Sequence, residues 1–304
     1  MRSIVQPGPP QPERIQWVEA RGRAFSFMLE PGLPLLEAVR QGFAAAGFSG
    51  GVLNTREGAL GPFAYVMPAL SRTGENAAFY SDTFRPAGVT RLKLAAMTLG
   101  ERDNGPFFHC HALWTEADGG AGGGHILPEE TVVAEPFAVE AFGIDGAMFA
   151  AEPDPETNFK LFGPIAFSSE VGTGSSEENA SKANDSLRGI EGTSRAFALR
   201  LRPNQDFAGA LEAFCRERGI IHAKVHGGVG STIGARFTNG RAVEPFATEV
   251  AVRSGVIAPG PDGTLRAELD IGLVEYTGGM AEGRLTRGDN PVLMTMELVL
   301  EVVR

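Results

Sequence analysis

The sequence predicts an α+β protein built from two tandem copies of one domain, each with a mostly antiparallel β-sheet packed on one main helix. Three observations support this prediction: an internal repeat, an amphipathic helix at the same place in both repeats, and alternating strand-like segments after each helix. A chain of 304 residues can form two domains that each bury their own core. We therefore expect a first domain at residues 15–150, a linker at 151–190 and a second domain at 191–304.

The repeat begins with Arg23-Ala24-Phe25-Ser26-Phe27, which returns 172 positions later as Arg195-Ala196-Phe197-Ala198-Leu199. A proline-containing turn follows each segment, and then a helical pattern with apolar residues on one face. These faces hold Leu35, Leu36, Val39, Phe43 and Ala46 in the first copy, and Phe207, Leu211, Phe214 and Cys215 in the second. Gly47 and Gly219 keep the same offset and stand where a glycine ends a helix. One main helix is thus expected in each copy.

Strand-like segments follow each helix. The alternation is clearest at residues 92–97 and 249–252, and apolar strands close the copies at 131–133 onward and at 292–298. Between the copies, residues 168–186 are rich in Ser, Gly, Glu and Asn, which is typical of a linker. The apolar stretch just before them, 159–167, is expected to pack on one of the domains.

Composition narrows the classes of function. The chain has 27 Lys and Arg against 37 Asp and Glu, and each half carries a net charge of −5, which argues against a general DNA-binding protein. No apolar run approaches the roughly 20 residues of a membrane span. The N-terminus lacks the basic and apolar regions of a secretory signal, so a cytoplasmic location is expected. In that compartment Cys110 and Cys215 are expected to be free thiols.

Three of the five histidines lie within one predicted hairpin. His109 and His111 alternate on a strand and so project from one face, while Cys110 points to the other. The turn signal at Asp118-Gly119-Gly120 is followed by His125, which is as far from Asp118 as His111 is. A regular antiparallel hairpin therefore places His125 opposite His111 and forms a triangle of imidazoles.

Three imidazoles suit a divalent metal ion. Zinc fits best, nickel, copper and iron(II) are admissible, and a position is left for water or another ligand. Gly122-Gly123-Gly124 would allow close approach to the metal. Two alternatives stay open: an H-x-H pattern is common on strands without metal, and a bulge among the glycines would move His125 off the face.

The second copy lacks this pattern. Its corresponding hairpin places Glu268 and Asp270 where His109 and His111 stand, and Arg284 where His125 stands. Two carboxylates and an arginine form an ion-pair cluster more readily than a metal site, so this second site is predicted to be lost or rebuilt. His222 and His226 would share one face of a strand, where packing or hydrogen bonding is the expected role.

The segment Phe108-His109-Cys110-His111, with Asp118-Gly119 and Gly123-Gly124-His125, resembles the signature of the plants-and-prokaryotes-conserved (PPC) domain family. The second copy resembles it through Gly230-Ser231 and through Glu249-Val250 to Ser254-Gly255. The resemblance covers residues 23–142 and 195–303.

The resemblance implies a mostly antiparallel α+β fold, assembly as a trimer, and a metal, often zinc, on His109, His111 and His125. Plant members carry AT-hook DNA-binding segments, and prokaryotic members bear the label of DNA-binding proteins. The nearest match to an AT-hook here, Arg21-Gly22-Arg23-Ala24, lacks the proline. Because Arg23 also belongs to the internal repeat, it is expected to open the first strand. The first copy also departs from the family, because Lys93 or Leu94 is expected where the second copy has Glu249.

Three functions follow from these features. The first is a metal-dependent enzyme or small-ligand binder, for which Glu116 and Asp118 are local candidates for a base. The second is a DNA-associated regulatory or oligomerisation module, which the charge disfavours. The third is a structural module in which the metal stabilises a hairpin or a trimer interface. A trimer of this chain would hold six domains and three metal sites.

Overall fold

The computed structural model describes residues 1–167 and 192–303. Within them the chain is rich in β-structure, with two helices of 11 residues each. The elements of the first copy are β1 (Ile15–Leu29), α1 (Leu35–Ala45), β2 (Gly50–Thr55), β3 (Ala59–Leu60), β4 (Tyr65–Val66), β5 (Pro68–Leu70), β6 (Ala78–Tyr80), β7 (Thr90–Arg102), β8 (Gly105–Thr115), β9 (Ala121–Ile126), β10 (Val133–Glu135) and β11 (Phe137–Asp145). The chain continues through β12 (Ala147–Pro153), β13 (Lys160–Ala166), β14 (Ser194–Leu201), α3 (Phe207–Glu217), β15 (Ala223–Arg236), β16 (Ala242–Pro259), β17 (Leu265–Glu275), β18 (Met280–Arg284) and β19 (Val292–Val302).

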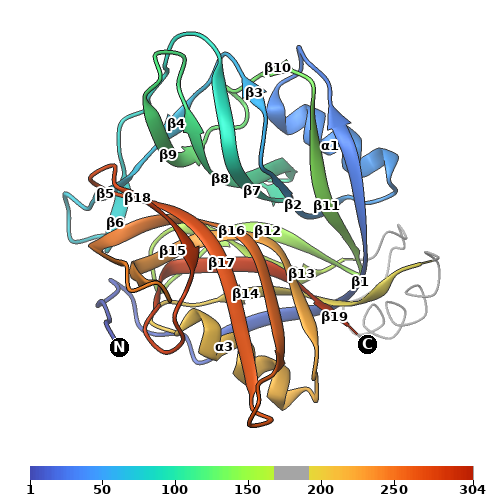
Figure 1. Cartoon of the computed structure of the whole chain (residues 1–304), viewed down its shortest axis with the longest axis vertical. Helices are drawn as coiled ribbons and strands as arrows, with labels where there is room; N and C mark the ends of the chain where they lie inside the picture. Colours follow the sequence, from blue (N-terminus) through green and yellow to red (C-terminus); the bar gives the residue numbers. More distant parts are fainter. Residues whose placement is uncertain (168–191, 304) are drawn as a thin grey trace.

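The two copies share one topology. In the first copy the antiparallel pairings run β1–β11–β2–β7–β8–β9, and in the second they run β14–β19–β15–β16–β17–β18. Strands β1 and β14 pair with each other, with Ile15 opposite Leu201, so the two sheets are continuous. Figure 1 shows the first copy above the second, with α3 on the outer side of the lower copy. The predicted mostly antiparallel sheet is confirmed, in a β-rich fold with one described helix in each copy.

Both helices form where the apolar pattern predicted them. Leu35, Val39 and Phe43 are buried on α1, and Phe207 and Leu211 are buried on α3. Each helix ends before a glycine in the left-handed region, Gly47 with φ +85° and Gly219 with φ +63°. The helices differ at their N-termini, because Asp206 caps α3 through Gly209 N whereas α1 begins after Pro34 without a side-chain cap.

Each sheet has two differently used faces. One face packs on the copy's own helix, and it carries Cys110 and Trp114 in the first copy and Val250 and Leu298 in the second. The other faces meet between the copies, where residues from both halves form a mixed cluster: Leu94, Ala96, Leu113, Val229, Ala251 and Val274. The inner faces of both sheets are therefore buried by the chain itself.

Several expectations at the ends of the copies can be compared with the structure. The apolar stretch after residue 158 packs as predicted: β13 pairs with β12, and Phe162 is buried. Arg23 lies within β1, which begins eight residues earlier at Ile15, so the prediction that Arg23 opens the strand is wrong. The predicted linker at 168–186, and most of the expected 151–190 segment, lies outside the described residues. Residues 151–153 of that segment belong to β12, and residues 160–166 belong to β13.

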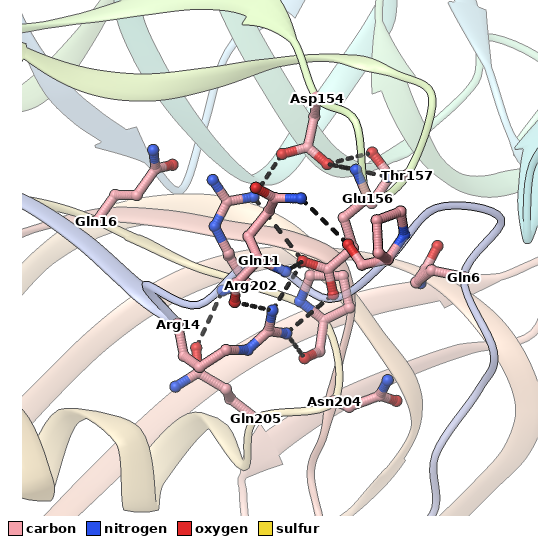
Figure 2. Close-up of polar contacts among 12 residues, drawn as sticks. Gln6, Gln11, Arg14, Gln16, Asp154, Glu156, Thr157, Arg202, Asn204 and Gln205 are labelled. Carbon is pink, nitrogen blue, oxygen red and sulfur yellow. Dashed lines mark hydrogen bonds and ion pairs between the residues drawn. The ribbon is translucent and has the colours of Figure 1, made fainter.

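A buried ion-pair network ties the start of the chain to the second copy. Asp154 binds Arg200 Nη2 at 2.7 Å and Arg202 Nη1 at 2.6 Å, and its side chain is 1% exposed. Glu156 binds Arg14, whose guanidinium also donates to the carbonyl oxygen of Pro203. Figure 2 shows Arg14, Asp154, Glu156 and Arg202 of this network close together. The network joins three separate segments across the copy boundary.

Burial opposes ionisation of Asp154, but the Arg200 and Arg202 guanidinium groups outweigh it and lower the pKa of that carboxyl below 3.8. Asp154→Asn should lower the free energy of unfolding by about 3 kcal/mol, because two buried guanidinium groups lose their counter-charge. Because a depressed pKa stabilises the fold only while the carboxyl is ionised, the difference from the unsubstituted protein should shrink as pH falls below about 4.

Urea unfolding at pH 7 and at pH 3 measures both effects. The matched control is Asp262→Asn, which removes an exposed aspartate paired with Arg266 and should shift the midpoint little. An equal shift for both variants, or a difference that does not depend on pH, would contradict a stabilising role for the Asp154 network.

Candidate metal centre

The hairpin of β8 and β9 brings the three histidines together as predicted. His111 pairs directly with His125 in the β8–β9 register, and His109 precedes His111 by two residues on the same face. The ring centroids are 4.5 Å apart for His109 and His111, and 4.9 Å apart for His109 and His125. Gly124, at φ +157°, leaves no room for a side chain, because a Cβ there would meet the carbonyl oxygen of Val66. The bulge considered among the glycines does not displace His125 within this register.

The second copy contributes two carboxylates to the same place. Glu249 on β16 contacts His111 Nε2, and Glu297 on β19 lies 2.7 Å from His109 Nδ1. One ligand atom from each of His109, His111, His125 and Glu249 lies within 4.8 Å of all the others. The candidate centre is therefore shared between the two copies, and its fourth donor atom is a carboxylate oxygen.

The electron-rich atoms of this centre converge. His111 Nδ1 donates to the carbonyl oxygen of Val250 at 3.0 Å, so its proton is on that side of the ring. The unprotonated Nε2 of a neutral His111 then faces His109 Nε2, 2.9 Å away, and the Glu249 carboxylate. Such a convergence in a buried place requires a cation, either a proton or a metal ion. The residues present therefore fit a divalent ion held by nitrogen and oxygen donors.

The pKa values of the histidines and of Glu297 reflect their burial and the charges around them. Burial, followed by the His111 charge, lowers the pKa of His109 to about 3. Burial also lowers the pKa of His125, whereas the Glu249 charge outweighs burial and raises the pKa of His111. Burial raises the pKa of Glu297 to about 8 against the opposing charges of His111 and Arg200. His109 and His125 are thus neutral near pH 7, which is the form that binds metals.

Space for an ion and its surroundings lies next to these groups. A cavity of about 40 Å³ is lined by His109, His111, Glu249 and Tyr80. Tyr80 comes from β6, and its ring centroid is 5.3 Å from that of His125. The first copy has 77 positions from Gly47 to Gly124, against 64 from Gly219 to Gly283 in the second. The extra residues build the small β5–β6 sheet, which has no counterpart in the second copy.

The sequence reasoning missed Glu249, Glu297 and Tyr80 as neighbours of the histidines. A signal was present for the glutamates, because each interrupts a mainly apolar stretch of its strand, and both are buried, with 8% and 0% exposure. The interpretation of Lys93 or Leu94 as the counterpart of Glu249 is wrong. Strand register places Arg91 there, since Glu249 pairs with Val274 and Arg91 pairs with Thr115, which is 159 positions before Val274. Bulges at different points of β7 and β16 shift the alignment.

Other sequence-based candidates lie outside the centre. Glu116 accepts a hydrogen bond from the Tyr65 hydroxyl at 3.1 Å, and Asp118 accepts one from Gly120 N in the hairpin turn. Neither carboxylate belongs to the group of converging ligand atoms. His226 lies in β15, where it binds Glu301 at 2.6 Å and stacks on Phe142, as a packing role predicted. His222 precedes that strand, so the expected pair on one strand face does not form.

The second copy's hairpin has the predicted ion pairs. Asp270 stands opposite Arg284 in the β17–β18 register, as His111 stands opposite His125. Arg284 binds Glu268 at 2.5 Å and Asp270 at 3.4 Å, and all three side chains are partly exposed.

Cys110 and Cys215 are buried free thiols, as expected. No helix among the described residues is long and apolar enough to cross a membrane.

Comparison with known families places this architecture. Residues 188–304 match the Plants and Prokaryotes Conserved (PCC) domain, the family whose signature the sequence resembles. The match lies in the second copy, and the first copy repeats the same order of strands and helix. No curated protein matches the chain.

Three solved structures of similar proteins each align with about half of the chain. A PPC protein from Pyrococcus horikoshii is 16% identical, with a TM-score of 0.38, and the alignment covers 49% of this chain and 97% of that one. A metal-containing protein from Archaeoglobus fulgidus is 18% identical, with a TM-score of 0.37 and coverage of 47% and 94%. A protein from Bacteroides thetaiotaomicron named for a suspected DNA-binding role is 14% identical, with a TM-score of 0.34 and coverage of 46% and 90%.

Because Glu297 orients His109 through Nδ1, Glu297→Gln should weaken metal binding by about 10- to 100-fold without removing a ligand. The matched control is Glu301→Gln, four residues along β19, which disturbs the analogous contact with His226 away from the centre. Competition with a chelator measures both affinities. Equal affinities for the two variants would contradict a positioning role for Glu297.

Proposed function

We propose that this protein binds one divalent metal ion per chain, with His109, His111, His125 and Glu249 as ligands, and uses it to bind a small molecule. The observation that carries the proposal is the convergence of two histidine Nε2 atoms and a carboxylate in a buried place. Zinc suits this mixture of nitrogen and oxygen donors, and iron(II) or nickel also suits it. When bound, such an ion polarises a ligand's oxygen atoms as a Lewis acid.

The chain's own residues would prepare the centre for the ion. Glu297 and the Val250 carbonyl fix the ring orientations of His109 and His111, which is the usual arrangement around metal-binding histidines. Glu249 adds a negative charge from the second copy, so the ligand set differs from the three-histidine site that the sequence suggested. Access remains beside His109 and His125, which also line a larger cavity.

Elemental analysis of protein purified without added metal tests the proposal. We expect close to one metal ion per chain, and a loss of at least 10-fold in metal affinity for both His111→Gln and Glu249→Gln. The controls are His226→Gln and Glu268→Gln, which change the same residue types outside the centre. Two ions per chain would refute the interpretation of the second copy, and undiminished binding by both site variants would refute the ligand set.

A ligand-binding role predicts that the fold survives removal of the metal. In both copies the core that packs on the helix lies on the sheet face opposite the candidate metal centre. The ion pairs of Arg284 hold the second copy's hairpin together without any histidine. Chelator-treated protein should therefore keep its far-ultraviolet circular dichroism and a cooperative thermal transition. Complete loss of that transition would favour the structural role of the metal instead.

Assembly and location are further proposals that rest on the family. A trimer of this chain would contain six domains and three metal centres, which light scattering combined with metal analysis measures. The cytoplasmic location stays a prediction from the sequence. We propose no DNA-binding role, because both halves carry a net charge of −5 and phosphate binding depends on clustered positive charge.

A further inference from the structure

A second, larger cavity adjoins the candidate metal centre. Its volume is about 300 Å³, which is at the lower end of the range for small-molecule sites. His109 and His125 line it, whereas His111 and Glu249 line only the smaller cavity. A molecule in the larger cavity would therefore meet the centre from the side of His109 and His125.

The charged side chains of this cavity differ in whether they form ion pairs with other described residues. Lys160 is paired with Asp103, and Glu130 is paired with Arg85 at 2.6 Å. Arg102 has only a distant contact with Asp103, at 3.9 Å, and its guanidinium makes no hydrogen bond within the described residues. Glu129 likewise has no ion pair among them. The cavity thus holds one available cation, Arg102, and one available carboxylate, Glu129.

Arg102 is held in place by an aromatic ring. Its Cζ atom lies 3.9 Å from the centroid of Phe107, a cation–π contact that fixes the guanidinium beside the cavity. Phe107 lies two residues before His109 on β8, so both side chains project from the same face of the strand. The ring that contacts the guanidinium is therefore a neighbour of the His109 side chain on one face of β8.

The rest of the wall is mainly apolar. Phe107 packs edge-on against Phe162 with centroids 5.8 Å apart, and Leu161, Phe159 and Leu127 extend this surface. Such a wall binds an apolar or aromatic group through burial and aromatic contacts. The cavity thus combines one available cation, Arg102, and two candidate metal ligands with a mainly apolar wall.

We propose that this cavity binds a small organic acid, with its carboxylate directed at the metal centre and Arg102 and its apolar part against Phe107 and Phe162. This inference rests on the proposed function, because the metal supplies part of the positive charge. Glu129 is the one available like charge in the cavity and opposes the ligand. Substitutions of Arg102 and Glu129 should therefore change the affinity in opposite directions.

Isothermal titration calorimetry of the metal-loaded protein with phenylacetate tests the proposal. Acetate lacks the apolar part, phenylacetamide is a neutral compound of similar shape, and inorganic phosphate is an anion without an apolar part. We expect phenylacetate to bind at least 10-fold more tightly than each of these three compounds, and at least 10-fold more tightly to metal-loaded than to metal-free protein. The proposal would be overturned if phenylacetamide or phosphate bound as tightly as phenylacetate. It would also be overturned if phenylacetate showed no binding at concentrations up to about 10 mM.

Variants at the cavity separate its charges. Arg102→Gln should weaken phenylacetate binding about 10-fold, equivalent to about 1.4 kcal/mol, and Glu129→Gln should strengthen it about 2-fold. The matched control is Arg91→Gln, which removes another exposed arginine of β7 that pairs with Glu135 away from the cavity. An unchanged affinity for Arg102→Gln, or a loss as large for Arg91→Gln, would contradict the assignment.

Two readouts keep this inference distinct from the metal proposal. Metal content is measured on every variant, and Arg102→Gln should retain one ion per chain. In cobalt-substituted protein, phenylacetate should change the visible absorption spectrum of the ion. Failure to load any metal would overturn both proposals, whereas a loaded protein whose spectrum and heat do not respond to phenylacetate would overturn only this one.

Discussion

The burial of carboxylates opposite imidazoles between the two sheets is the constraint on which the rest of the centre depends. Glu297 is fully buried and Glu249 nearly so, and a carboxylate in such a place is costly unless a cation or a hydrogen-bond donor accompanies it. His109 and His111 are the partners that the first copy provides. These contacts between histidines and glutamates form only if the inner sheet faces of the two copies pack in one register. The packing of the two copies and the geometry of the centre therefore depend on each other.

Duplication allows the two copies to take different parts in a single centre. The first copy supplies the histidines from β8 and β9, and the second supplies the carboxylates from β16 and β19. By strand register Arg91 and Ala138 stand where Glu249 and Glu297 stand in the second copy. A reciprocal centre therefore lacks both its imidazoles and its carboxylates. Arg200, which pairs with Glu297 across β14 and β19, also connects the centre's surroundings to the Asp154 network.

Much of this arrangement was predictable from local patterns. Periodicity gave the helices α1 and α3 and their glycine termini, because helix formation and termination depend on residues close in sequence. The opposition of His111 and His125 also followed from one short hairpin. The ion pairs around Arg284 followed from applying the same register to the second copy.

The contribution of the second copy was not predictable in the same way. Glu249 lies 138 residues from His111 in sequence, and only the packing of one sheet face on another brings them together. A strand pattern reports which face a residue occupies but not what the face meets. Tyr80 was missed for another reason, since it lies in a segment that the second copy lacks, and comparison of the copies could not place it. Unequal bulges also displaced the alignment that assigned Lys93 or Leu94 to the position of Glu249.

Anomalous scattering from a crystal of the metal-loaded protein, recorded at the absorption edge of the metal, tests the shared centre most directly. The account predicts one strong peak per chain, bounded by the imidazoles of His109, His111 and His125 and by the carboxylate of Glu249. It predicts no peak at Glu268, Asp270 and Arg284. A peak at that second hairpin, or an ion held by the histidines with Glu249 turned away, would contradict the claim that both copies build one centre.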